Sequence, residues 1–176
     1  SNLQPQVWQT VSLRVSEACD NMVTFNAPLT LKTPSSDIFS ELNSPHLIIQ
    51  FAFASAPEQS CCILLDQDTA ASYASFLRGE AYSDVDENII TDIRPALEAI
   101  VQGICVAVGT MRNAPVGAPG LAILYQLFTP PQNLSKSSEL IRVNVALSGE
   151  EMSGTVIWIM DAEMAYAVTG MQLPEE

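Results

Sequence analysis

The sequence predicts an α+β fold in which long helices pack on one face of a largely antiparallel sheet, built as one sheet of six strands or as two of three. Three observations predict it. Two long segments carry apolar residues at helical spacing, six short segments have the composition of strands, and both halves of the chain repeat one order of elements. A chain of 176 residues with 48% hydrophobic content is expected to form one domain over 3–172, followed by an acidic tail over 173–176.

The first half of the chain begins with a helix and a strand. Residues 5–22 predict an amphipathic helix, because apolar side chains recur at helical spacing at Val7, Val11, Val15 and Met22. The segment "APLTLKTP", residues 27–34, alternates apolar and polar side chains between two prolines and predicts a short strand. Residues 35–45 are expected to form a connection with a single helical turn.

A hairpin and a second helix are expected to complete the first half. Residues 46–54 and 61–67 are strongly apolar and indicate two strands joined by the polar turn "SAPEQS". Asp68 is expected to cap the following helix, and Gly79 is expected to end it.

The second half contains the strongest helical pattern in the chain. After an acidic loop over 80–88, Asp92 is expected near the helix cap and Pro95 in the first turn, where the missing N–H of proline breaks no bond. Gly109 is expected to end this helix. Its apolar stripe contains Ile93, Leu97, Ile100, Ile104 and Val108.

A loop rich in proline and glycine, residues 113–120, leads into the last predicted elements. Three strands are expected, over 121–129, 140–148 and 154–160. Asp161 is expected to start a final helix over 162–171.

The repeated order of elements indicates an internal duplication, with half-repeats over about 5–80 and 86–171. The halves match at an offset of 81 around their first helices and at an offset of 93 further on. The matched positions are Glu17 with Glu98, Asn21 with Gln102, Pro34 with Pro115, Asp68 with Asp161, and Tyr73 with Tyr166. A duplication predicts long helices related by a pseudo-twofold axis.

Charge and composition exclude several classes of partner. Twenty acidic and seven basic residues give a net charge of −13, which opposes binding to nucleic acid or to anionic lipid. No apolar run reaches the roughly 20 residues of a membrane span, and no basic-then-apolar segment opens the sequence, so we expect a cytoplasmic protein without membrane insertion. Four cysteines without CxxC spacing and a single histidine, His46, predict no disulfide, no metal and no cofactor.

Two stretches, "CCILLDQDTAASYASFLRG" and "ALEAIVQGICVAVG", resemble the CheC, CheX and FliY group of chemotaxis phosphatases, which shares its fold with the middle domain of FliM. The resemblance covers residues 7–170 and rests on the layout of the elements. It implies a domain that docks on a CheY-like response regulator or on a component of the flagellar motor. It also implies a helix whose Glu pairs with a basic residue of the receiver, while an Asn three residues later positions the water that attacks the aspartyl phosphate.

This sequence departs from the family pattern on both helices. The residue three after Glu17 is Asp20, and the residue three after Glu98 is Val101, so the expected amide is absent from both places. A carboxylate at Asp20 repels a phosphoryl anion and has no N–H donor.

The amides of this chain stand one residue further along. Asn21 and Gln102 are displaced by about 100° around the helix and about 1.5 Å along it, which favours loss of the oriented water. Residues four apart still share a helix face, so the candidate catalytic residues are Glu17, Asn21, Glu98 and Gln102. Arg94, four residues before Glu98, is able to form a surface ion pair with it.

Three functions are compatible with these residues. We favour a non-catalytic or weakly active binding module of chemotaxis or flagellar-type signalling. The first alternative is a phosphatase of a phosphorylated CheY-like receiver that uses the shifted pair, and the second is an unrelated α+β binding domain. Pairing of strand edges would also permit a homodimer, and strands that are apolar on both sides predict that a partner covers the second face of the sheet.

Overall fold

The computed structural model describes residues 3–169, so the expected acidic tail and residues 170–171 of the last predicted helix lie outside the described part. Within it, one order of elements, α-β-α-β-β-α, occurs twice. The elements are α1 (Gln4–Cys19), β1 (Thr24–Pro34), α2 (Ser35–Glu41), β2 (His46–Phe51), β3 (Cys61–Asp66), α3 (Gln67–Arg78), α4 (Glu87–Arg112), β4 (Ala122–Gln126), α5 (Gln132–Lys136), β5 (Glu139–Gly149), β6 (Met152–Met160) and α6 (Ala162–Thr169).

The strands form one six-stranded antiparallel sheet with the order β1-β5-β6-β3-β2-β4. This confirms the α+β class, and it decides between the two predicted arrangements in favour of a single sheet. If each strand is replaced by its counterpart in the other half (β1 by β4, β2 by β5, β3 by β6, and the reverse), the same order is obtained, read from the opposite edge of the sheet. A twofold axis between β3 and β6 would produce that symmetry, and superposition of the two halves stays a prediction.

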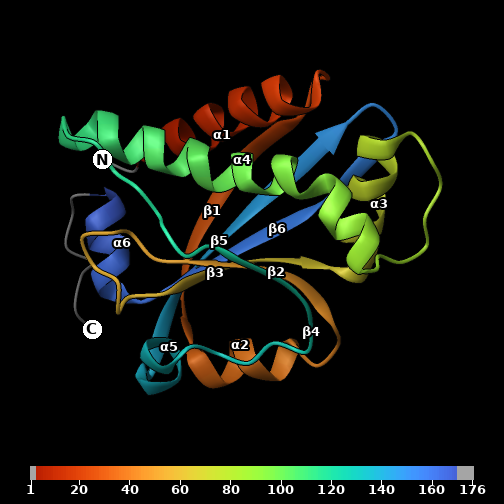
Figure 1. The fold of residues 1–176 in the computed structure, drawn as a ribbon. Coiled ribbons are helices and arrows are strands. Elements are labelled where there is room, and N and C mark those ends of the chain that lie inside the picture. The colour runs from red at the N-terminus through yellow and green to blue at the C-terminus, as the bar shows by residue number, and fades with distance from the viewer. Residues whose placement is uncertain (1–2, 170–176) are drawn as a thin grey trace.

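Helices cover both faces of the sheet (Figure 1). On one face α1 and α4 lie side by side, over a core that includes Trp8 and Trp158. On the other face the short helices α2 and α5 bury Ile38 and Leu134 against strand residues such as Leu64. The long helices therefore pack on one face as expected. The second face of the central strands is covered by the chain itself, so the prediction that a partner covers it is wrong there.

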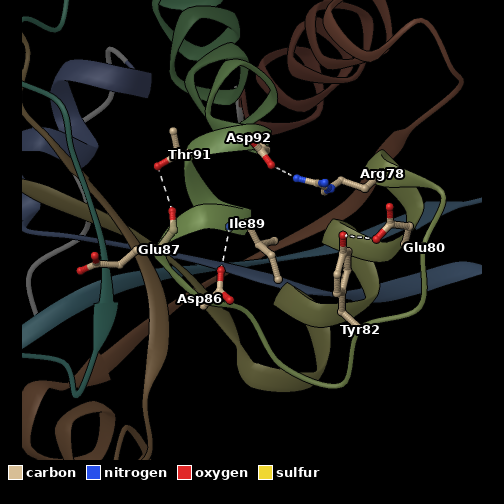
Figure 2. Close-up of polar contacts among 8 residues, drawn as sticks. All are labelled: Arg78, Glu80, Tyr82, Asp86, Glu87, Ile89, Thr91 and Asp92. Carbon is tan, nitrogen blue, oxygen red and sulfur yellow. Dashed lines mark hydrogen bonds and ion pairs between the residues drawn. The ribbon is translucent and has the colours of Figure 1, made fainter.

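The long helix α4 begins at Glu87, earlier than the sequence indicated. Its cap is Asp86, whose Oδ1 accepts a hydrogen bond from the backbone N–H of Ile89 at 2.8 Å (Figure 2). Asp92 is not the cap, because it lies inside the helix, where its carboxylate forms an ion pair with Arg78 at the end of α3. Both acids suit a helix start, and the ion pair to α3 leaves the capping role to Asp86.

The end of α4 also differs from the prediction. Pro95 lies inside the helix rather than in its first turn, and the helix continues past Gly109 to Arg112. Asn113 ends it with a left-handed backbone, at a φ of 55°. By length and composition alone this 26-residue helix is long and apolar enough to cross a membrane, contrary to the prediction that no segment is. However, 56% of its apolar window is buried inside the described part of the chain, as in a core helix.

Acidic caps also start the two shorter helices that follow β3 and β6. Asp66, not Asp68, caps α3 by accepting a backbone hydrogen bond at 2.8 Å. Asp161 caps α6 in the same way, also at 2.8 Å, as expected. Gly79 ends α3 with a φ of 69°, and that prediction is confirmed as well.

The structure corrects the register of the proposed repeat. An offset of 81 places β1 on residues 105–115, which belong to α4 and to the loop after it, whereas the counterpart of β1 in element order is β4. The match of Pro34 with Pro115 is therefore wrong. The caps Asp66 and Asp161 occupy corresponding places in the two halves, so the later offset is nearly right.

Candidate functional site

Glu98 and Gln102 lie one turn apart on α4 and line a common groove. The groove has a volume of about 570 Å³ and is bounded by α4, by α1 and by the loop that leads into β4. Its polar side chains are Arg14, Arg94, Glu98 and Gln102, and its apolar wall includes Val101, Val106, Val116 and Leu121. The second acid-amide pair is thus brought together on the surface.

The carboxylate of Glu98 already has a cationic partner within the chain. Its Oε1 lies 2.7 Å from Nε of Arg94, and the two side chains are 36% and 43% exposed. This confirms the pairing predicted from the helical spacing. An exposed pair of this kind contributes only a few tenths of a kcal/mol, so a partner's cation is able to compete with Arg94 for the carboxylate.

Val101 occupies the place at which the resemblance implies an amide. Its side chain is buried, with 4% exposure, and forms part of the groove wall. Valine offers neither a donor nor an acceptor to a water molecule. The nearest amide along the helix is Gln102, which is exposed. The groove therefore has a carboxylate and an amide, but not at the spacing that orients a water.

The first acid-amide pair is not formed, because α1 ends before it is complete. The helix stops at Cys19, and Asp20 adopts a left-handed backbone with a φ of 52°. Asn21 therefore lies beyond the helix, where its Oδ1 accepts a hydrogen bond from the N–H of Met22 at 2.9 Å. Glu17 is exposed on the last turn of α1. The prediction that Glu17 and Asn21 share a helix face is wrong.

Sequence reasoning missed Arg14, which α1 contributes to the groove. Arg14 is exposed on α1, and packing of α1 against α4 brings it to the same groove as Glu98 and Gln102. No local motif distinguishes it from other surface arginines. Only the contact between the two helices places it beside the candidate residues.

His46 and three of the four cysteines are buried within the fold. His46 is buried at 5% exposure, and its Nδ1 lies 2.7 Å from the carbonyl oxygen of Ser44, to which the ring donates. Burial raises the pKa of the thiols of Cys61, Cys62 and Cys105, with that of Cys62 raised to about 12. Within residues 3–169, no group of three or more His, Cys, Asp or Glu side chains is arranged to hold a metal ion.

Comparison with known proteins finds relatives by structure alone, since no family model and no curated protein sequence match. FliY from Thermotoga maritima superposes with a TM-score of 0.79 at 10% identity, over 92% of this chain and 87% of that chain. The FliG–FliM complex from H. pylori gives 0.70 at 12% identity, over 96% and 94%. The CheX–CheY–BeF3–Mg2+ complex from Borrelia burgdorferi gives 0.52 at 17% identity, over 91% and 97%.

These matches cover nearly the whole of each chain. The chain therefore has the CheC/CheX/FliY-like fold that the sequence resembled. At identities of 10–17%, these matches show the fold alone. The chemistry of the site follows from the residues of this chain.

Proposed function

We propose that residues 3–172 form one cytoplasmic domain that acts as a non-catalytic or weakly active binding module in chemotaxis or flagellar-type signalling. The groove around Glu98 and Gln102 docks a CheY-like receiver. One observation carries the proposal: Val101, at the amide position, is buried and apolar, while Glu98 and Gln102 stay accessible in a groove. Charge attraction tolerates a displaced group, whereas in-line attack by a water does not.

The fold supports a binding role. The structures that superpose on this chain include a FliG–FliM complex and a CheX–CheY complex, so proteins of this fold assemble with motor components and with CheY. The same likeness argues against an unrelated α+β binding domain.

Phosphatase activity through the shifted pair is the second candidate. It is favoured by the position of Gln102, whose exposed carboxamide shares the groove with the carboxylate of Glu98. It is disfavoured by Val101, a buried apolar side chain at the place where an amide would orient the attacking water. If the chain is an enzyme, its substrate is a protein aspartyl phosphate.

A homodimer through strand edges is not part of the proposal. The outer strand β1 contains Pro28 and Pro34, and its register with β5 shifts between Asn26 and Leu29. Prolines and irregular register interrupt the row of backbone groups that a second strand would need. At the other edge, β4 is only five residues long.

The test uses a purified CheY-like receiver from the same genome. Binding to its beryllofluoride form is measured by fluorescence anisotropy, and loss of phosphate from its phosphorylated form is measured separately. We expect binding without faster dephosphorylation. Glu98→Gln should weaken binding, and Arg94→Gln should strengthen it, because the carboxylate of Glu98 is then free.

Glu139→Gln is the matched control, since Glu139 forms an exposed ion pair with Lys32 on the sheet edge, away from the groove. It should leave binding unchanged. Absence of any binding to the receiver would refute the docking role. An acceleration of about tenfold or more that Gln102→Ala abolishes would establish the phosphatase instead.

A further inference from the structure

Arg14 differs from every other arginine of the described chain. No ion pair or hydrogen bond of its guanidinium is formed with residues 3–169, although Glu17 lies only three residues further along the same helix. The other arginines have partners: Arg78 with Asp92, Arg94 with Glu98, Arg112 with the carbonyl of Ala167, and Arg142 with Glu41. The net charge of −13 on the whole chain opposes anions, so this unpaired cation beside the groove is the local feature that attracts an anionic group.

The charges that line the groove sum to a positive value. Arg94 and Glu98 neutralise each other across 2.7 Å, and Arg14 adds an uncompensated positive charge. Gln102 adds a carboxamide with two N–H donors. The planar guanidinium of arginine matches a carboxylate through two parallel hydrogen bonds, so the favoured occupant carries a planar anion.

The wall of the groove adds a second requirement. Val106, Val116 and Leu121 supply apolar surface from α4 and from the loop before β4. A free carboxylate ion would leave this surface uncovered, whereas an apolar side chain next to an acid would bury it. The groove thus fits a segment in which acidic and apolar side chains adjoin.

We infer that the groove binds a short acidic-apolar peptide segment of a partner protein. The carboxylate of an Asp or Glu accepts hydrogen bonds from Arg14 and from Gln102, while an adjacent apolar side chain packs on Val106 and Leu121. The inference deepens the proposed function. It rests on that function only where it takes the partner to be a receiver. It adds a contact of opposite sign to the one between Glu98 and a basic residue of the partner.

The experiment uses the whole chain and two fluorescein-labelled peptides. One alternates leucine and aspartate, and the other has asparagine in place of each aspartate, so that they differ in charge and hardly in shape. Binding is followed by fluorescence anisotropy, and the site is located by NMR through the side-chain amide of Gln102 and the backbone amides of Gly117 and Gly120, which line the groove. We expect the aspartate peptide to shift these signals and to bind more weakly as salt is added.

Arg14→Gln should weaken binding of the aspartate peptide about tenfold, because the charge-assisted hydrogen bond from the guanidinium to the peptide carboxylate is lost. Arg14→Lys should restore part of it, since lysine keeps the charge but lacks the planar fork. Lys136→Gln is the matched control: Lys136 is an exposed cation on α5, on the other face of the sheet, with no ion pair among the described residues. It should leave binding unchanged.

Equal binding of both peptides, or an equal loss in Arg14→Gln and Lys136→Gln, would overturn the inference. Circular dichroism of each variant checks that the fold is intact. The receiver assay separates this inference from the proposed function. If the peptide binds and the receiver does not, the receiver is not the partner, and the groove is still a peptide site. If the receiver binds and Arg14→Gln leaves that binding unchanged, the inference is wrong, and the docking role stands.

Discussion

Gly103 of α4 lies against the backbone of Val11 of α1. A Cβ atom added at Gly103 would lie 2.7 Å from Cα of Val11 and 3.0 Å from one of its methyl carbons. Real Cβ atoms do not approach backbone so closely, so only glycine allows the two helices to pack at this distance. Because this contact brings α1 against α4, it also brings Arg14 to the groove that contains Glu98.

Gly103→Ala should destabilise the protein by about 1–3 kcal/mol, because the backbone of α1 has to move away. Alanine favours the helix over glycine by about 1 kcal/mol, which offsets part of this loss but does not make the variant more stable than the original protein. Urea denaturation measures the free energy of unfolding. Gly117→Ala is the control, since a Cβ there meets no atom within 4 Å, and it should be near neutral. A stabilised Gly103→Ala variant would contradict this packing.

Asp86→Ala should destabilise the protein by about 1 kcal/mol, because it leaves the N–H of Ile89 at the start of α4 without its 2.8 Å partner. Asp92→Ala removes only a partly exposed ion pair with Arg78 and should cost less. Thermal unfolding of both variants measures the difference. If Asp92→Ala is the more damaging, α4 begins later than the structure shows.

Val101→Asn restores the family spacing between a Glu and an Asn on α4. We expect a loss of about 1–3 kcal/mol in stability and no gain in phosphatase rate, because the amide enters a buried position. Val106→Asn provides the control, since Val106 is 39% exposed on the same helix and should tolerate the change. A stable Val101→Asn variant that hydrolyses the receiver's phosphate would show that this position reaches the docked partner.

Cys19 should react with iodoacetamide before the other three cysteines. Burial raises the pKa of Cys62 to about 12 and raises that of Cys61 well above its ordinary value, so little thiolate forms in the folded protein at neutral pH. Cys19 is only partly buried, although burial raises its pKa too. Mass spectrometry of peptides identifies the labelled residue. Equal labelling of all four thiols, or a native mass two protons lower per cysteine pair, would contradict the free buried thiols.

The same thiols give the stability a pH dependence. Their pKa is raised in the folded state, so the stabilisation is complete below the unfolded value of 9.0 and is lost as pH rises above it. Cys62→Ala should make the decline above pH 9.0 less steep. An unchanged slope in that variant would rule out Cys62 as a contributor.

Most of the order of elements and the buried stripes were predictable from local sequence, whereas the short helix α5 was not predicted. Val7, Val11 and Val15 recur at helical spacing, and all three are buried in the core beneath α1. Gly79 ends α3 as expected, since a left-handed backbone there favours glycine. These features depend on residues close together in the chain, and so a single sequence is enough to find them.

Helix ends were less predictable, because neighbouring residues offer equivalent choices. Apolar spacing predicts that the first helix extends to Met22, yet α1 ends at Cys19. As the chain turns into β1, the backbone N–H of Val23 donates a hydrogen bond to Oγ of Ser16. That turn removes Asn21 from the helix. The acid-amide pair does not form on α1, because the chain turns into a strand before Asn21. Helical periodicity cannot predict where such a turn occurs.

The sequence alone determined the fold class and the placement of Glu98 and Gln102 one turn apart on one helix, because both follow from short-range periodicity. The tertiary structure decided that the six strands form a single sheet. Tertiary structure alone decided which acid-amide pair survives and that Arg14 joins it. The physical reason is that the groove forms between elements distant in the chain. Its shape depends on how closely α1 approaches α4 at Gly103, and a contact between backbones leaves no periodic pattern in the sequence.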